Sequence, residues 1–371
     1  MKRLRAILDL ARWAPSGDNS QPWRFEIRSP RHVVVHAIAP QLGVYDLEGH
    51  ASLVSVGALL ETLRIAASAD GFVVYTALQS ESGSDLARID VWLEPAPGLA
   101  ADPLHAFILT RSVQRRPLHT RALDESTRKM LEAAAGQAYR VVWFATTRER
   151  LRLAWLAVRS AKIRLTIPEA YEVHRRVIEW DALTSEDRIP DQALGADRLS
   201  VRSMRWVLHS WPRVQRMNRW FGGTLAPRFQ LELMPGLRCA AHFALLAEHA
   251  PVSVDDYLAA GAAVQRFWLT ATSLGVQLQP QYTPIAFAGY VRRGIAFTRT
   301  ASATARAVTI TAMLETILGV GKPERAVFLG RLGHGPTATA RSLRLPLEQL
   351  AWSGASPPTG TPASTHPPVK G

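Results

Sequence analysis

The chain has 371 residues, of which 47% are hydrophobic and 20% charged, a balance typical of a globular protein rather than a disordered one. Its 44 Lys and Arg against 31 Asp and Glu give a net charge of +13, which favours anionic ligands or surfaces without choosing among them. A single cysteine, Cys239, excludes an intrachain disulfide and argues against a thiolate zinc site.

The N-terminus runs directly into an amphipathic helix, so we predict no signal peptide, and no stretch reaches the ~18 apolar residues of a membrane span. The sequence also lacks zinc-finger spacing, an RNP-type motif and a compact Lys/Arg block. We therefore expect a cytoplasmic protein with no integral membrane segment, no metal and no nucleic-acid partner.

In chain order, an amphipathic helix up to Ala11 is followed by a polar loop, Ala14–Pro22, and a strand at Trp23–Phe25. A helix over 57–71 follows, then an Arg-rich segment at 111–117 and a helix starting near Asp124. Apolar-rich segments predict strands at 33–35, 73–75, 89–92, 141–144 and 327–329. Helices dominate by residue count, so we expect an α+β fold.

The chain contains an internal repeat. Residues 57–71 align without a gap on 261–275; both segments begin and end with glycine and carry apolar residues at helical spacing. Residues 5–11 likewise match 128–134, and each leads into a strand. Any two amphipathic helices look alike, but two matches in the same order favour two fused, diverged copies.

The two copies differ in complementary ways. Copy one has the Ala14–Pro22 loop, where copy two has only 135–138, and copy two is preceded by 111–117, for which copy one has no counterpart. We expect half one at 1–100 and half two at 101–350, with an Arg- and Trp-rich insertion at about 150–235. We interpret the insertion as a lid or packing element, although membrane-surface helices have the same composition. The Pro/Ser/Thr/Gly tail, 353–371, should be disordered.

Three segments carry candidate chemistry. Arg111 and Arg115, with Ser112, and a second pair, Arg341 and Arg344, offer guanidinium groups that suit phosphate oxygens. On composition alone each cluster is equally well a solvated face. The Ala14–Pro22 loop offers short polar side chains and glycine, which lets the backbone approach a planar ligand closely.

The order of residues in these segments resembles the FMN-dependent nitroreductase family. Residues 8–25 resemble its signature, Thr110–Pro117 resembles its N-terminal phosphate-binding motif, and 332–336 followed by 341–346 are similar to its C-terminal end. The resemblance spans about residues 4–350 except the insertion, and implies a nitroreductase-like fold with antiparallel and mixed sheets flanked by helices. The duplication most resembles the Acg-like subgroup, in which one chain forms a pseudo-dimer.

By this resemblance the site residues fall into three groups. The phosphate would contact Arg111, Ser112, Arg115, Arg341 and Arg344. The flavin would lie near Pro15, Ser16, Gly17 and Asn19, and Pro280 and Gln281 fall on a strand that faces the ring in the family. Gln281-Tyr282 replaces the family's acidic residue and glycine, which argues against direct hydride donation by NAD(P)H and leaves the electron donor open.

The resemblance implies an FMN-dependent oxidoreductase in which reduced flavin passes hydride to a small electron-poor acceptor, with no catalytic side chain assigned. The alternatives are a non-catalytic FMN-binding or storage protein and an accessory subunit that binds a protein partner. Because both sides of the flavin interface lie in one chain, we expect a monomer. His242, on an apolar segment read as a helix, is expected to be a packed residue.

Overall fold

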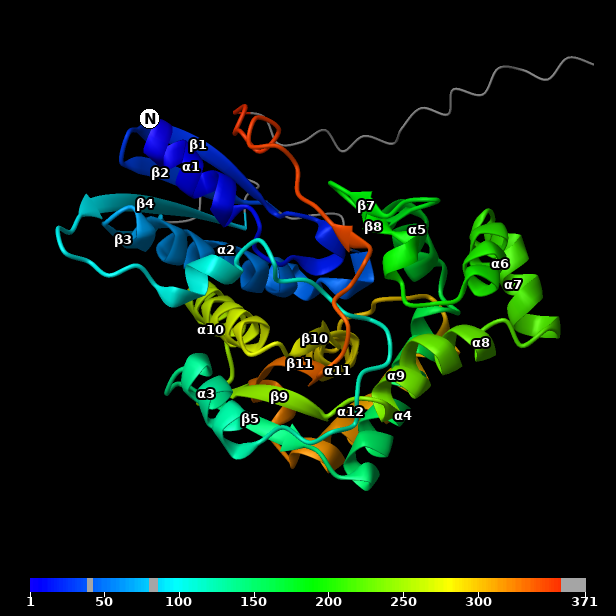
Figure 1. Ribbon diagram of the computed structural model, residues 1–371. Coiled ribbons are helices and arrows are strands. Elements are labelled where there is room, and N and C mark those ends of the chain that lie inside the picture. Colours follow the sequence, from blue (N-terminus) through cyan, green and yellow to red (C-terminus); the bar gives the residue numbers. More distant parts are fainter. Residues whose placement is uncertain (39–42, 80–85, 355–371) are drawn as a thin grey trace, which may run out of the picture.

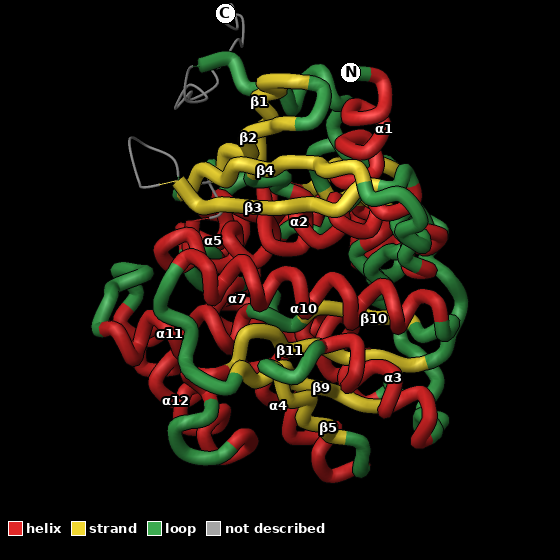
Figure 2. The backbone as a smooth tube through the Cα atoms, turned by 90° about the vertical axis from the view of Figure 1, so that its left-hand side faces the viewer, coloured by secondary structure: helices red, strands yellow, loops and turns green. Residues whose placement is uncertain are grey.

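The structure, a computed structural model, describes residues 1–38, 43–79 and 86–354. This part of the chain forms two four-stranded antiparallel sheets separated by two long helices, α2 (His50–Ala69) and α10 (Val254–Ser273) (Figures 1 and 2). The expected α+β class, with antiparallel sheets flanked by helices, is confirmed.

Both sheets follow one topology. The first is ordered β1-β2-β4-β3 and the second β5-β9-β11-β10, and every neighbouring pair is antiparallel. In both, the long central helix connects the second strand to the strand at the far edge. The strands are β1 (Trp23–Ser29), β2 (His32–Ala37), β3 (Phe72–Gln79), β4 (Ala87–Pro95), β5 (Tyr139–Phe144), β9 (Ala241–Ala247), β10 (Gln277–Pro280) and β11 (Ala326–Gly333). This repeated order supports the interpretation of two fused copies.

The central helices meet at equivalent positions of the repeat. A Cβ on Gly57 would lie 2.0 Å from the Leu258 carbonyl oxygen, and a Cβ on Gly261 would lie 2.0 Å from the Val54 oxygen. Only glycine permits so close a helix contact. Flanking bonds repeat the symmetry, because the Gln265 amide donates to the Thr62 hydroxyl and Arg266 donates to the Glu61 carboxylate, at 2.9 and 2.8 Å.

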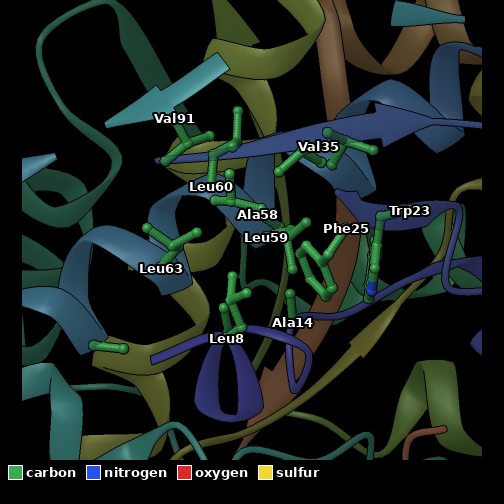
Figure 3. Packing of buried hydrophobic residues seen from close by; sticks show 14 of the residues in the cluster. Leu8, Ala14, Trp23, Phe25, Val35, Ala58, Leu59, Leu60, Leu63 and Val91 are labelled. Atoms are coloured by element: carbon green, nitrogen blue, oxygen red, sulfur yellow. The ribbon is translucent and has the colours of Figure 1, made fainter. Parts of the chain in front are cut away.

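Each copy places a shorter helix against its central helix: α1 (Lys2–Ala11) packs on α2, and α3 (Glu125–Ala135) packs on α10. The Asp124 side chain caps α3 by accepting from the Thr127 amide. Glycines in the left-handed region, Gly71 and Gly275, follow α2 and α10 as predicted. Figure 3 shows Leu8, Trp23, Phe25 and Leu59 in the first copy's core, where α1 and α2 bury apolar faces against the sheet.

His242 is fully buried, as expected of a packed residue, but it lies on strand β9, so the helix predicted there was wrong. Apart from His242, the run Ala241–Ala247 is apolar because β9 lies between β5 and β11 and is buried on both faces. An almost fully apolar run of this length has neither helical nor strand periodicity.

The insertion of copy two occupies the chain between β5 and β9. Its first helix, α4 (Thr147–Arg164), belongs to the second copy's core, where it packs on α12. The rest projects outward at the right of Figure 1 as α5 (Pro168–Val177), α6 (Arg198–Leu208), α7 (Trp211–Trp220), α8 (Leu225–Arg228) and α9 (Met234–Leu237). The short strands β6 (Ile178–Glu179), β7 (Thr184–Ser185) and β8 (Ile189–Pro190) lie between α5 and α6.

The remaining helices, α11 (Thr283–Arg293) and α12 (Ala301–Leu318), connect β10 to β11. After β11 the chain forms β12 (Arg341–Ser342), which pairs with β7 of the insertion, and then returns to copy one. There Phe25 on β1 pairs with Ala351, and its amide donates to the Leu350 oxygen at 2.8 Å. The predicted disordered tail lies outside the described residues from 355 onward.

One helical segment, Leu47–Ala69, is long and apolar enough to cross a bilayer, but 89% of its most apolar window is buried in the protein. It contains the central helix of copy one, so its apolar character is explained by packing in the core.

Candidate functional site

A cavity of about 580 Å³ lies between the two copies and the insertion. Four segments that are remote in sequence line it: the loop after α1, the segment 111–115, the end of β10 and the region of β12. The cavity is therefore lined by all the site residues predicted from the sequence: Pro15, Ser16, Gly17, Asn19, Arg111, Ser112, Arg115, Pro280, Gln281, Arg341 and Arg344. Its volume lies within the range of about 300–1,000 Å³ typical of small-molecule sites.

Three arginines gather at one end of the cavity. The guanidinium of Arg344 donates to the Ala14 carbonyl oxygen at 2.8 Å, and that of Arg111 donates to the Trp13 oxygen at the same distance. Arg341 donates to the Leu109 oxygen, also at 2.8 Å. Because all these acceptors are neutral carbonyls, the hydrogen bonds fix the side chains without neutralising them.

The charge of this trio has no carboxylate partner among the described residues. Burial, followed by the charges of Arg344 and Arg341, lowers the pKa of Arg111. Burial, with Arg341 and Arg12 nearby, lowers the pKa of Arg344 to about 9. Buried like charges without a counter-ion are costly, so this arrangement is suited to bind an anion.

Two of these arginines also hold unused donors. The Nε atoms of Arg111 and Arg341 are buried with no hydrogen-bond partner. The Arg111 guanidinium lies 4.6 Å from the centre of the Trp268 ring, which holds it flat against α10. An oxyanion at this end would meet donors that are already oriented.

Arg115 lines the same cavity but faces the insertion. Its guanidinium donates to the Ala193 carbonyl oxygen at 3.2 Å. The charges that act on its pKa are those of Asp18 and Arg164, not those of the trio. The segment 111–115 is extended, with Val113 bridged to Leu278 of β10, so Arg111 and Arg115 emerge roughly 13 Å apart.

The loop after α1 is strained. Asp18, Asn19 and Gln21 have φ angles of 50°, 61° and 47°, a left-handed conformation that side-chain-bearing residues adopt at a cost of order 1–3 kcal/mol each. The Gln21 backbone N–H donates to the Ser16 hydroxyl at 3.0 Å, and the Gln21 side-chain oxygen accepts from the Leu345 backbone N–H at 2.9 Å. These bonds hold the loop against the segment that carries Arg341 and Arg344.

Asn19 connects this loop to the insertion. Its side-chain amide donates to the Glu186 carbonyl oxygen at 3.0 Å, while its own Oδ1 is buried and has no donor. The cavity therefore has unsatisfied donors at the arginine end and an unsatisfied acceptor at Asn19.

Gln281 is held by a buried histidine. His242 Nε2 lies 2.8 Å from the Gly236 carbonyl oxygen, and Nδ1 lies 2.9 Å from the Gln281 side chain. Burial lowers the pKa of His242 to about 4, so the ring is neutral at pH 7 and has one N–H. Both contacts are to oxygen atoms, Gly236 O and Gln281 Oε1, so the single N–H of the neutral ring can donate to only one of them.

Sequence analysis missed Arg331, which is fully buried on β11. Its Nη2 donates to the carbonyl oxygens of Arg115 and Arg116 at 2.7 and 3.0 Å, and its Nε donates to the Gln279 side chain. Arg331 thus fixes the Arg-rich segment against β10. A single arginine inside the apolar run 326–333 was the available signal.

The insertion adds polar groups to the opposite wall. Arg164 forms an ion pair with Glu232, and the Tyr45 hydroxyl lies 2.8 Å from His174 Nε2. Burial raises the pKa of Asp18, against the opposing effect of Arg115 and Arg164. The rest of this wall combines apolar side chains, such as Met204, Val207, Val214 and Met217, with a few polar ones, among them Ser200 and Asn218.

The equivalent position of the other copy lacks the strained loop. α3 ends at Ala135 and β5 begins at Tyr139, which leaves no room for a loop like 12–22.

No protein-family model matches the chain, and a search of curated proteins also finds no match. Solved structures give weak likenesses. A nitroreductase-like family protein from Bacillus cereus is 11% identical over 67% of this chain and 94% of its own, with a TM-score of 0.34. The FMN-dependent nitroreductase from Mycobacterium smegmatis, solved with NADPH, is 16% identical over 66% and 94%, with a TM-score of 0.33.

A BluB-like flavoprotein from Clostridium difficile 630 is 15% identical over 68% of this chain and 98% of its own, with a TM-score of 0.36. TM-scores and identities this low carry no functional inference.

Proposed function

We propose that this chain is a single-site FMN-binding oxidoreductase of the nitroreductase type, in which one copy holds the phosphate and the other contacts the ring. The observation that carries the proposal is the trio Arg111, Arg341 and Arg344, which has no carboxylate partner among the described residues and faces a cavity of flavin size. The family and its Acg-like subgroup are suggested by the sequence motifs.

The residues present fit FMN. A phosphate monoester at the arginine end would meet the free Nε donors of Arg111 and Arg341. A donor on the ligand would satisfy the Asn19 Oδ1 atom. Ser112 lines the cavity beside Arg111, and Pro15, Ser16 and Gly17 line it as an exposed turn that admits close contact by a planar ring.

When bound, FMN supplies the hydride chemistry. The chain's own residues bind and orient it: the trio anchors the phosphate, Arg331 fixes the Arg-rich segment, and His242 orients the Gln281 amide. The apolar wall of the insertion excludes water from the side where a small, electron-poor acceptor would bind. No side chain is assigned as a general acid.

The runner-up is a non-catalytic FMN-binding or storage protein. It is favoured by Gln281 and Tyr282, which line the cavity where the resembled family has an acidic residue and glycine. An accessory subunit with a protein partner is the third reading. In each of these proposals the chain is cytoplasmic. NAD(P)H is one candidate electron donor for the oxidoreductase.

The test is anaerobic. The flavin-loaded protein is mixed with NADH or NADPH, or reduced chemically, and a nitroaromatic or quinone acceptor is then added while flavin absorbance is followed. Rapid reoxidation by the acceptor supports the oxidoreductase; flavin that is bound but inert to acceptor supports storage.

The double change Arg111→Ala and Arg341→Ala tests the site, with Arg3→Ala and Arg121→Ala as a control that removes the same charge. We expect flavin retention to fall by about two to four decades only in the first variant. Full flavin retention there would show that the phosphate site is wrongly assigned.

A further inference from the structure

The outward face of the insertion exposes large apolar side chains. Trp220, the last residue of α7, is 71% exposed, and Leu225, the first residue of α8, is 64% exposed. Leu199, Trp206 and Phe229 in the same region are also more than half exposed. Scattered single residues of this kind are normal at a protein surface, but a concentration marks an interaction site.

The same stretch is strongly basic. Between Asp197 and Glu232 the chain has seven arginines and no aspartate or glutamate. Arg202, Arg216 and Arg219 are exposed, and the guanidinium of Arg219 lies 5.1 Å from the centre of the Trp220 ring. This arrangement combines positive charge with amphipathic rings over one short segment.

The two sides of these helices have different roles. Met204 and Val207 of α6 and Met217 of α7 line the cavity, whereas Trp206 and Trp220 lie outside its lining and are exposed. Contact with the cavity therefore accounts only for the apolar residues on the inner side of α6 and α7. α6 and α7 lie at the edge of the molecule in Figure 1, where an extended flat surface can reach them.

We propose that the outer face of α6–α8, defined by Trp206, Trp220, Leu225, Phe229 and the exposed arginines, docks on the surface of an anionic lipid bilayer. Charge complementarity selects the lipid: arginines are attracted to anionic headgroups, and tryptophan rings favour the interfacial layer. Nucleic acid would satisfy the arginines as well, but it offers no environment for exposed Leu199 and Leu225. This peripheral docking is independent of the flavin proposal.

The experiment is vesicle flotation of the full chain. Vesicles contain phosphatidylcholine alone or phosphatidylcholine with about one third phosphatidylglycerol, whose negative surface potential attracts basic segments. We expect binding to the anionic vesicles only, and loss of binding when salt is raised from about 0.1 to about 1 M, because the Debye length falls from about 10 to 3 Å.

Two matched pairs of variants locate the surface. Trp220→Ser with Leu225→Ser removes a Trp and a Leu from the docking face, and Trp155→Ser with Leu151→Ser removes the same types from the exposed side of α4. Arg216→Glu with Arg219→Glu reverses two charges on the face, and Arg3→Glu with Arg121→Glu reverses two elsewhere. Circular dichroism and thermal melting confirm that each variant folds.

We expect vesicle affinity to fall at least tenfold in both docking-face variants and less than about threefold in both controls. Equal binding to neutral vesicles, or equal loss in the controls, would overturn the proposal. The proposal would also be overturned if the docking-face variants bound vesicles as tightly as the wild type. The same holds if they lost binding only to a DNA duplex that is added as a competitor.

Discussion

Removing one charge from the arginine trio should have opposite effects on stability and on ligand binding. Arg341 is the best member to change, because it is half-buried and its charge lowers the pKa of both Arg111 and Arg344. In Arg341→Gln the two remaining guanidinium groups lose a repulsive neighbour. We therefore expect the free energy of unfolding of the flavin-free variant to equal that of the wild type or to exceed it by up to about 1 kcal/mol.

The same change removes a charge-assisted contact to phosphate, worth about 1.5–3 kcal/mol. FMN affinity should then fall by roughly one to two decades. Denaturant unfolding of the flavin-free protein and quenching of FMN fluorescence measure the two effects, and Arg3→Gln serves as a control with the same loss of charge. Inorganic phosphate should stabilise the wild-type protein more than Arg341→Gln.

The reasoning is refuted if Arg341→Gln binds FMN as tightly as wild type. It is equally refuted if the flavin-free variant is destabilised by more than about 1 kcal/mol while Arg3→Gln is unaffected, since the trio would then stabilise the fold instead of awaiting an anion.

Three further predictions concern the frame around the site. Gly57→Ala places a methyl group 2.0 Å from the Leu258 oxygen and should lower the free energy of unfolding by about 1–3 kcal/mol or more. The control Gly289→Ala, also in a helix, meets only the end of the Leu47 side chain and should cost much less. Equal losses for the two variants in denaturant melts would contradict the close helix contact. Burial lowers the pKa of His242 from 6.5 to about 4. The neutral ring therefore contributes to stability above pH 6.5, and this contribution is lost as pH falls toward 4, by at most about 1.4 kcal/mol per pH unit. Unfolding midpoints measured against pH should show this slope, and a His242→Gln variant with an unchanged slope would exclude His242 as its source. Light scattering at micromolar concentration should give a monomer near 40.9 kDa, because α2 and α10 already pair within one chain; a mass near twice that value would show that a second chain covers the insertion.

Sequence analysis identified the cavity residues because their order along the chain is informative. The Arg-rich segment, the Ala14–Pro22 loop and the C-terminal arginines are far apart in sequence, yet all of them line one cavity. The central helix pair was also predictable, since Gly57 and Gly261 stand at equivalent positions of an ungapped repeat.

Other features depended on tertiary context. Strand β9 was taken for a helix because a segment buried on both faces has no periodicity. The different surroundings of Arg111 and Arg115 follow from the insertion, whose Ala193 oxygen accepts from Arg115, and no local pattern predicts that contact. The return of the chain to β1 near Leu350 is likewise a pairing between the two ends of the sequence.

The interpretation of the insertion as a lid or packing element does not account for its exposed outer side. Its inner side lines the cavity and its first helix belongs to the core, but the exposure of Trp206 and Trp220 shows that packing does not use all its aromatic residues. Composition could not separate these roles, because an amphipathic helix has the same periodicity whatever covers its second face.

The central claim is that two fused copies form one flavin site, because copy two supplies the Arg-rich segment and copy one supplies the strained loop. Quantifying FMN released from purified, flavin-saturated protein tests this claim most directly. We predict one FMN per chain. A ratio near two would show that the second position binds flavin without these elements, and a ratio near zero after saturation would show that the arginine trio serves a different anion.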